Sequence, residues 1–401
     1  MKVVFVTTSF IRSATDYYSY FIYEQAESLA LENGEAKVTV LAPHSPGCAA
    51  RENIGLLRVV RFPYFFPFRL QRLAYQTDGL FKTMARSPLA LLQLPLFLMS
   101  MFVHIFIYGR NAQIIHAQWI PTAFVALPLK FFWKVKIVVS VRGSDLHGIN
   151  KPGFKQNVYR LLLNRLDAIL PVSKDFHRIL QNEMKVTAPI TPLFNGVNTT
   201  HFRRHASDVA KANFGLKNGE PLFLYVGNLV LHKGVDTLLK AFADVLKLHP
   251  TARLLLAGEG PELQRFTDIA LELGITSQIK FLGLVERENV PMLMSAAEVL
   301  VLPSLGEGRP NVVIEAMACE SLVIATGVGG TKELIDHTKT GFLFTPGDVQ
   351  KLAEHMNFAL SHPDQARALA RDARASLTEK ELTWETHGEK LNKVYRSLVP
   401  N

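Results

Sequence analysis

The sequence predicts an α/β protein of two domains, each a doubly wound parallel sheet covered by helices. A chain of 401 residues is too long for one compact core. Both halves alternate short apolar runs with segments of helical length, which is the pattern of parallel sheets. The runs are rich in Val, Ile, Leu and Phe without polar alternation, as expected of strands buried on both faces. We therefore expect ligands outside the carboxyl ends of the strands.

The apolar runs give the order of the strands. In the first half we expect strands at 3–8, 37–42, 112–117, 136–141 and 168–172, and in the second half at 222–227, 253–258, 279–284, 298–303, 322–326 and 341–346. The stretch 186–203 contains two prolines and an Asn-Gly, so we expect the last strand of the first domain and the linker there. The predicted domains are 1–195 and 196–382, and a final helix is expected at 383–399.

One long apolar segment, residues 89–108, has two interpretations: a membrane span, or a helix that is buried or lies on a membrane surface. Twenty largely apolar residues are enough to span a bilayer. However, Gln93, Pro95 and His104 interrupt the run, and a span here would divide the first sheet between two compartments. We therefore expect a buried or membrane-surface helix.

The charge of the chain is unevenly distributed. Residues 1–195 contain 22 Lys and Arg against 11 Asp and Glu, whereas the remainder contains 22 against 24. The excess of positive charge predicts an acidic partner for the first half, either nucleic acid or an anionic membrane surface. No recognised nucleic-acid motif accompanies the cations, so we predict no nucleic-acid partner.

The segment 58–76 alternates arginines with aromatic residues. This composition suits the lipid headgroup zone, where cations meet anionic lipids and rings settle at the interface. The candidate membrane- or acceptor-facing residues are Arg61, Arg69, Arg72, Phe65 and Phe66. The alternative is an aromatic surface loop that folds against its own domain.

Two cysteines far apart, Cys48 and Cys319, indicate no disulfide framework and favour a reducing, cytoplasmic compartment. The first residues are expected to form a strand and not a signal peptide.

The stretch 303–317, PSLGEGRPNVVIEAM, is the most informative motif. It places Glu307 and Glu315 eight positions apart, across a junction between a loop and a helix. The amides of Asn311 and Val312 begin that helix, where the helix dipole favours an anion. Carboxylates accept hydrogen bonds from hydroxyls, so the arrangement suits a ligand that combines sugars with phosphates, such as a nucleotide-sugar. The alternative is an ordinary amphipathic helix with Glu307 in a solvated turn.

This run resembles the signature of the family 4 retaining glycosyltransferases, which have the two-domain GT-B fold. The resemblance continues through 225–242, 254–263, 279–285 and 323–335 in the expected order. It implies two Rossmann-like domains that face a central cleft, with the helix 383–399 packing back on the first. It also implies a hexosyltransferase-like enzyme of EC 2.4, which transfers a sugar with retention by front-face attack assisted by a donor phosphate oxygen.

The resemblance assigns most of the donor site. It makes Lys233 the lysine that binds the donor diphosphate, Glu315 the acceptor of the ribose hydroxyls, and Glu307 a residue near the donor sugar. Gly227 and Asn228 belong to the same donor loop as Lys233. Asn228 departs from the family, because members commonly have an arginine there as a second diphosphate clamp.

A second departure lies in the loop 141–148. Similar enzymes often have a histidine where this chain has Arg142, and that histidine contacts the donor sugar. Our hypothesis is that Arg142 supplies the missing second cation and is catalytic together with Lys233 and Glu307. The early loop 9–21 also lacks the family's Gly-Gly pair, having Ser13 to Asp16 instead, so that contact is not carried over.

Taken together, these features predict a cytoplasmic glycosyltransferase, peripheral on the inner face of the cytoplasmic membrane. The first domain would bind a saccharide acceptor, lipid-linked, for surface polysaccharide synthesis, and the second would bind the nucleotide-sugar. No Asp-x-Asp pair occurs, so we predict no metal and no cofactor beyond the donor. The departures at Asn228 and Arg142 leave an alternative open, a catalytically degenerate GT-B scaffold or sugar-nucleotide-binding protein.

Overall fold

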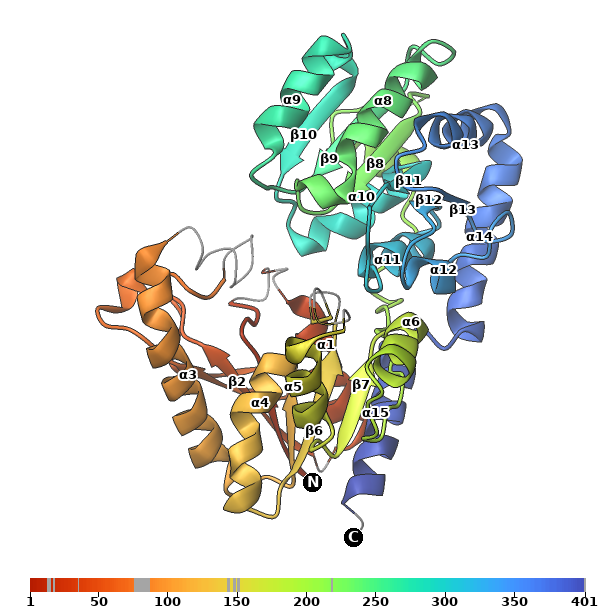
Figure 1. Cartoon of the computed structure of the whole chain (residues 1–401). Coiled ribbons are helices and arrows are strands. Elements are labelled where there is room, and N and C mark those ends of the chain that lie inside the picture. The colour runs from red at the N-terminus through yellow and green to blue at the C-terminus, as the bar shows by residue number, and fades with distance from the viewer. Residues whose placement is uncertain are drawn as a thin grey trace. The chain divides into compact units, whose positions relative to one another are not determined.

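The computed structural model describes residues 1–12, 16, 19–34, 36–75, 87–142, 145–146, 149, 152–217 and 219–399. The chain forms two compact units (Figure 1). Unit 1 comprises Met1–Asn195 and Trp384–Asn401, and unit 2 comprises Gly196–Thr383. Each unit contains its own mainly parallel sheet flanked by helices, so the predicted α/β fold class is confirmed. The structure divides the chain at 195/196, where the sequence places the same boundary.

The sheet of unit 1 has the order β3-β4-β2-β1-β5-β6-β7. Its strands are β1 (Lys2–Val6), β2 (Lys37–Pro43), β3 (Arg51–Ile54), β4 (Leu57–Phe62), β5 (Ile114–Ala117), β6 (Lys136–Val141) and β7 (Ala168–Pro171). The pairs are parallel except β3–β4, which is antiparallel. The strand order reverses between β1 and β5, and a reversal of this kind places a crevice at the carboxyl ends of the strands.

Helices cover both faces of this sheet. They are α1 (Tyr20–Glu32), α3 (Pro88–Gly109), α4 (Ile120–Ala126), α5 (Phe154–Leu163), α6 (Lys174–Arg178) and α15 (Trp384–Leu398), with the short turns η1 (Phe68–Leu70), η2 (Leu127–Phe131) and η3 (Ile179–Glu183). α15 packs against α1 at Gly388, where an added Cβ would overlap the carbonyl of Ser28. Leu391 and Tyr395 of α15 are fully buried in the core on that face.

The hairpin β3–β4 was not predicted, and it corrects one assignment. Arg61 lies on β4 and is only 1% exposed. Its guanidinium donates to Oε1 of Glu52 on β3 at 2.8 and 3.0 Å, and to the carbonyl of Ile11 at 2.7 Å. A buried charge is tolerated when it is paired and hydrogen-bonded in this way. The prediction that Arg61 faces a membrane or acceptor is therefore wrong.

α3 contains the long apolar segment. Among the described residues it is the one helix long and apolar enough to cross a membrane. One face, with Ala90, Phe97, Met101 and Ile105, is buried against β1, β2 and β4. These residues recur at helical spacing, so this side of α3 belongs to the core of unit 1, and the outward side of the helix is apolar as well.

The sheet of unit 2 is entirely parallel, with the order β10-β9-β8-β11-β12-β13. Its strands are β8 (Leu222–Val226), β9 (Arg253–Ala257), β10 (Ile279–Gly283), β11 (Val299–Leu302), β12 (Leu322–Thr326) and β13 (Phe342–Phe344). This is the doubly wound order, and it reverses between β8 and β11. Loops that follow these two strands therefore border a crevice at the carboxyl edge.

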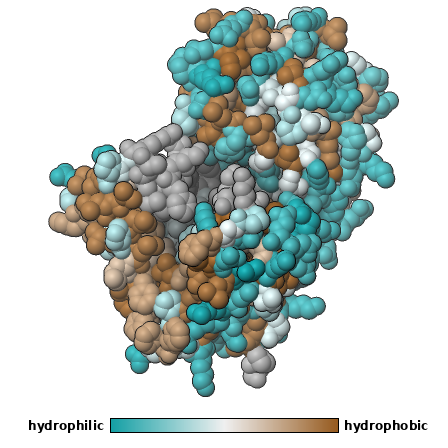
Figure 2. Space-filling view, in the orientation of Figure 1, coloured by the Kyte–Doolittle hydropathy of each residue, from teal (hydrophilic) through white to brown (hydrophobic). Residues whose placement is uncertain are grey.

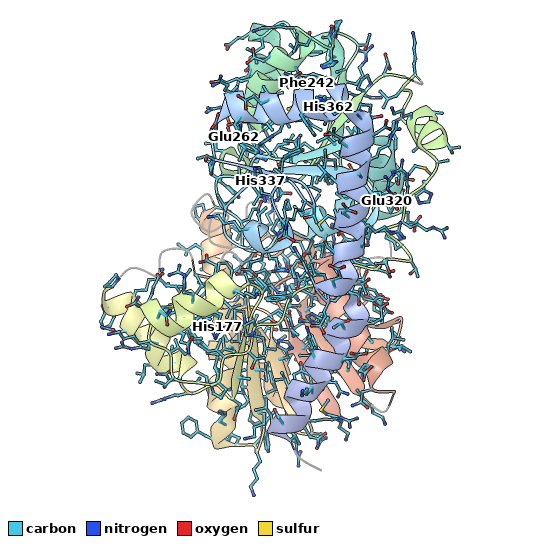
Figure 3. All side chains as sticks on the ribbon, turned by 90° about the vertical axis from the view of Figure 1, so that its right-hand side faces the viewer. His177, Phe242, Glu262, Glu320, His337 and His362 are labelled. Carbon is cyan, nitrogen blue, oxygen red and sulfur yellow. The ribbon has the colours of Figure 1, made fainter. Side chains whose placement is uncertain are left out.

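The helices of unit 2 are α7 (Ser207–Asn213), α8 (Val235–Leu246), α9 (Leu263–Glu272), α10 (Val290–Ala296), α11 (Asn311–Ala318), α12 (Thr331–Leu334), α13 (Val349–Ser361) and α14 (Pro363–Glu379), with the turns η4 (Leu231–Lys233), η5 (Thr276–Gln278) and η6 (Arg287–Asn289). Glu320, which follows α11, lies beside α14 and accepts from Arg374 at 3.2 Å (Figure 3). Arg204 approaches the same carboxylate at 3.4 Å. These ion pairs fix the carboxyl end of α11.

Candidate donor site

The loops after β8 and β11 bring together two of the predicted site residues. Lys233, at the end of η4, donates from Nζ to Oε1 of Glu307 at 2.6 Å. The hydroxyl of Ser304 donates to the same oxygen at 2.6 Å. The side chains of Lys233 and Glu307 are 21% and 10% exposed, so the pair is partly shielded yet reachable from solvent. The pair sits at the point where the strand order reverses, which is where doubly wound sheets bind ligands.

Backbone contacts hold the two loops in place. The amide of Leu305 donates to the carbonyl of His232 at 2.8 Å. Gly234 adopts a φ of 65°, and an added Cβ there would overlap the carbonyl of Pro303. Glycine is the residue that accepts this conformation at little cost. The position of Lys233 relative to Glu307 is thus set by backbone packing as well as by their ion pair.

Two glycines of the segment after β12, Gly329 and Gly330, pack closely against the backbone of the loop that carries Glu307. Gly329 has a φ of 46°, and an added Cβ would overlap the carbonyl oxygen of Glu307. The amide of Gly330 donates to the carbonyl of Gly308 at 2.9 Å. The segment after β12 therefore buttresses the loop that carries Glu307. Sequence reasoning gave these glycines no such role, because the contact joins segments about twenty residues apart.

Gly227 and Asn228 follow β8 directly. The buried hydroxyl of Tyr225 donates to the carbonyl of Asn228 at 2.9 Å. Burial raises the pKa of Tyr225, and the negative charge of Glu307 raises it further, so the phenol remains a neutral donor. The side chain of Asn228 is exposed, as a residue that faces a ligand would be. The neutral amide stands where the family commonly has a cation.

α11 begins at Asn311, so the amides of Asn311 and Val312 form its first turn. Glu315 lies one turn further on, partly buried, with Oε1 3.7 Å from Nη1 of Arg287. Burial raises the pKa of Glu315, and the positive charge of Arg287 opposes this rise. Arg287 itself lies 5.0 Å from the ring of Phe202. Its role was not predicted, since η6 carries no recognisable motif.

Another buried ion pair lies within the motif. Arg309 donates from Nη1 to Oε2 of Glu333 on α12 at 2.8 Å. Burial lowers the pKa of Arg309 to about 10, and the charge of Glu333 opposes this fall. The pair connects the loop of Glu307 to α12, again through residues that no local pattern associates.

Comparison with known proteins now assigns the chain to a family. Residues 207–376 match the family "Glycosyl transferases group 1", and residues 19–196 match the "Glycosyl transferase 4-like domain". The chain belongs to the group 1 glycosyltransferases. Its fold is GT-B, and it is a transferase of class EC 2.4 that uses a nucleotide-sugar donor.

Relatives of this glycosyltransferase differ in substrate. An N-acetyl-alpha-D-glucosaminyl L-malate synthase from Bacillus anthracis is 28% identical over 275 residues, 68% of this chain and 71% of the relative. A GDP-mannose-dependent monoacylated alpha-(1-6)-phosphatidylinositol monomannoside mannosyltransferase from Corynebacterium glutamicum is 27% identical, over 69% of this chain and 74% of the relative.

Two solved structures share the fold of the whole glycosyltransferase. Sucrose-phosphate synthase from Thermosynechococcus elongatus has a TM-score of 0.82 at 23% identity, and covers 99% of this chain and 98% of its own. The Anabaena protein HepE, solved in complex with UDP-glucose, has a TM-score of 0.74 at 19% identity, and covers 99% of this chain and 100% of its own. At these identities the likeness concerns the fold.

Arg142 lies in unit 1 and follows β6. Its side chain is 5% exposed. The guanidinium donates to Oδ1 of Asn195 at 3.2 Å, to Oε1 of Gln25 at 3.1 Å and to Oε1 of Gln118 at 2.7 Å. Burial lowers the pKa of Arg142 to about 9, although the nearby Asp145 opposes this fall. The catalytic role of Arg142 stays a prediction. Its hydrogen bonds indicate that it holds together the segments of Gln25, Gln118 and Asn195 at the carboxyl ends of the strands of unit 1.

The remaining surface residues differ in exposure. Phe66 is 80% exposed, and Arg69 and Arg72 are also exposed. Phe65 is half-buried and packs on the core beneath α3. The early loop's Ser13 to Thr15 lie outside the described residues.

Within the described part of the chain, no group of three or more His, Cys, Asp or Glu side chains is placed to hold a metal ion. Metal-independent transfer stays a prediction.

Proposed function

We propose that this enzyme transfers a sugar, with retention of configuration, from a nucleotide-diphosphate-sugar to a saccharide acceptor. The observation that supports the proposal best is the contact between Lys233 and Glu307 at the reversal point of the second sheet. A cation and a carboxylate side by side match a ligand that presents phosphates next to sugar hydroxyls. Group 1 membership makes glycosyl transfer the reaction they serve.

The donor diphosphate is assigned to Lys233 and to the amides at the start of α11. Charge grows on the departing phosphate in the transition state, and a fixed ammonium and a helix amino terminus stabilise it there. Lys233 would then exchange Glu307 for a phosphate oxygen. Glu307 would be left to accept from hydroxyls of the donor sugar.

Glu315 is assigned to the ribose of the donor. A carboxylate accepts from two vicinal hydroxyls, and the positive charge of Arg287 at 3.7 Å opposes the rise that burial causes in the pKa of Glu315. The assignment places ribose beside α11 and the diphosphate nearer its first turn. The order ribose, diphosphate and sugar then follows the order Glu315, Lys233 and Glu307.

The proposed transfer needs no protein nucleophile and no metal. The bond between the anomeric carbon and the diphosphate oxygen breaks, and an acceptor hydroxyl oxygen forms the new bond on the same face. The acceptor proton passes to the departing phosphate oxygen. Lys233 stabilises the nucleoside diphosphate that leaves.

We assign donor binding to unit 2 and acceptor binding to unit 1, with a lipid-linked saccharide as the acceptor. The enzyme would act at the cytoplasmic face of the membrane in surface polysaccharide synthesis. Two observations support this. The excess cations fall in residues 1–195. The corynebacterial relative acts, by its name, on a phosphatidylinositol mannoside.

A catalytically degenerate sugar-nucleotide-binding protein is the second candidate, because Asn228 and Arg142 depart from the family pattern. Thermal unfolding with UDP-, GDP-, ADP- and TDP-sugars tests donor binding, since a ligand that binds the native state raises its melting temperature. We expect one nucleotide class to stabilise the wild type but not Glu315→Ala. Glu354→Ala, an exposed acid on α13, should behave as the wild type. No shift with any donor would refute the donor site.

Turnover then separates the two candidates. Proton NMR of the product should show the anomeric configuration of the donor. Binding without transfer to any saccharide would favour the degenerate candidate, and an inverted product would refute retention.

A further inference from the structure

We propose that the outward side of α3 docks flat on an anionic lipid surface, with phosphate headgroups held by cations at both ends of the helix. The α3 face is defined as Leu91, Leu92, Leu96, Leu98, Met99, Val103 and Ile107, joined by Phe131 and Phe132 of the following η2 region. This proposal goes beyond the transfer reaction and does not depend on it.

The exposed side of α3 is uniformly apolar. Every exposed residue between Pro88 and Gly109 is Pro, Leu, Met, Val or Ile. Figure 2 shows this side of unit 1 as hydrophobic surface over α3. Soluble proteins rarely expose a contiguous patch of this kind unless it binds a membrane or another protein.

Aromatic residues extend the face at the carboxyl end of α3. Phe106 contacts Phe132 and Trp133, with ring centroids 5.6 and 5.2 Å apart. Phe131 and Phe132 are strongly exposed beside it. Aromatic rings settle readily at a membrane–water interface. The face therefore has an aliphatic middle and an aromatic border.

Two basic cavities adjoin that same end. One, of about 670 Å³, is lined by Lys2, Lys37 and Arg58 and reaches Ile107 of the α3 face. The guanidinium of Arg58 lies 5.7 Å from the ring of Tyr108 on α3, which fixes the cation next to the helix.

The other cavity, of about 500 Å³, is lined by Lys130, Lys134 and Lys136 with Phe131 and Phe132. Asp167 pairs with Lys130 at 2.7 Å and with Lys136 at 3.3 Å. Among the described residues lining the two cavities, Asp167 is the only acid against six cations.

Cations also flank the amino end of α3. Arg72 is exposed, and its amide donates to Oε1 of Gln93 on α3 at 3.1 Å. Arg69 is exposed in η1, next to the exposed ring of Phe68. Arginines and phenylalanines thus border this end as lysines and phenylalanines border the other. An apolar strip between two cationic ends matches acyl chains below a layer of phosphates.

The same features argue against a bilayer span. Ala90, Phe97, Met101 and Ile105 belong to the core of unit 1. The amide of Gln93 donates to the carbonyl of Leu70 at 2.7 Å. If α3 crossed the bilayer, its buried side would have to leave the core of unit 1. If α3 lies in the membrane interface, that side stays in the core.

The cations at the two ends of α3 also argue against a second copy of the chain as the partner that covers the α3 face. In a twofold contact the same patch meets itself, so the cations at the two ends would face other cations. An anionic surface complements them.

Flotation of the purified full-length chain with vesicles tests the proposal. One vesicle is phosphatidylcholine alone, and the other is equal parts phosphatidylcholine and phosphatidylglycerol. We expect binding to the anionic vesicles, weakened by high salt because surface electrostatics are screened. Leu92→Asp should weaken partitioning roughly tenfold, since it replaces an inserted side chain with a charge. Leu271→Asp, an equally exposed leucine on α9 of unit 2, should leave it unchanged; the two side chains are 66% and 68% exposed.

A second pair of variants tests the role of the cations. Lys134→Glu should weaken binding to the anionic vesicles, whereas Lys240→Glu on the exposed side of α8 should not. Circular dichroism melting verifies that each variant is folded, and Met99→Asp replaces Leu92→Asp if the latter unfolds.

Three results would overturn the proposal: no flotation of the wild type, equal flotation of Leu92→Asp, or a dimer in sedimentation that Leu92→Asp converts to monomer. The last would assign the face to a second copy. Transfer to a water-soluble acceptor is measured separately, and Leu92→Asp should leave it unchanged. Absence of transfer in every variant with intact flotation would refute the proposed reaction and not the docking surface.

Discussion

Acidification should weaken unit 1 through His387, which lies on α15 and is almost fully buried. Nδ1 is 2.6 Å from the carbonyl oxygen of Phe194, and Nε2 is 2.9 Å from Nε2 of Gln25. Because the carbonyl only accepts, Nδ1 carries the hydrogen and the other ring nitrogen accepts from the amide. A second proton on the ring would face an N–H of Gln25. That amide cannot simply turn over, because its oxygen accepts from Arg142 at 3.1 Å.

The size of the effect follows from the pKa. The pKa of His387 is lowered to about 4, chiefly by burial and in part by the charge of Arg142, while the hydrogen bond to Phe194 opposes the fall. In the unfolded chain the pKa is about 6.5. Between these values the folded state binds fewer protons, so the contribution to stability is full above about pH 6.5 and is lost as the pH falls through the folded value. At about pH 5 the loss is about 2 kcal/mol of the free energy of unfolding.

Urea unfolding followed by tryptophan fluorescence measures this loss in unit 1, which contains His387. The three tryptophans, Trp119, Trp133 and Trp384, all belong to unit 1. Between pH 7 and pH 5 the wild type should lose about 2 kcal/mol more than His387→Gln, which cannot titrate. His362→Gln, at an exposed site of unit 2, should follow the wild type. Equal losses in wild type and His387→Gln would refute the reasoning.

Three further predictions concern the donor site. Lys233→Ala should lower kcat/KM by about 10²- to 10³-fold, because it removes a fixed charge from the leaving diphosphate; an unchanged steady-state rate would contradict the assignment. Gly329→Ala should lower the free energy of unfolding by about 2 kcal/mol or more, through its positive φ and its overlap with the carbonyl of Glu307. Gly306→Ala faces open space and should change the free energy of unfolding by less than about 0.5 kcal/mol; both variants are followed by circular dichroism, because the tryptophans report on unit 1. Transfer should proceed unchanged in EDTA, and a rate that Mg²⁺ restores would show that metal is required.

The strands were largely predictable, because parallel strands buried on both faces read as uninterrupted apolar runs. β3 and β4 were missed for a physical reason. Arg58 and Arg61 interrupt the run, and an arginine beside aromatic residues suggests a surface. The antiparallel pairing of β4 with β3 brings Glu52 to Arg61, and this ion pair makes the burial of Arg61 tolerable.

The residues of the candidate donor site could be named from the sequence where one motif carries them, and their roles stay predictions. Glu307, Glu315 and the start of α11 lie in a single run, and Lys233 lies in a recognisable loop. Arg287 and Glu333 were missed, and the contact of Gly329 with the loop of Glu307 was not predicted, because all three act through other segments of the chain. Such contacts are a property of the fold, and a single sequence carries no local signal for them.

The return of α15 to unit 1 has a consequence for synthesis. The core that contains Phe5, Ile22 and Leu29 is completed by Leu391 and Tyr395, which are made only after all of unit 2. Unit 2 is one uninterrupted segment, and its two ends meet where the amide of Val197 donates to the carbonyl of Leu382 at 2.9 Å. Domains fold as units during translation. Unit 2 can therefore finish folding on the ribosome before unit 1, whose core stays open until α15 has been made.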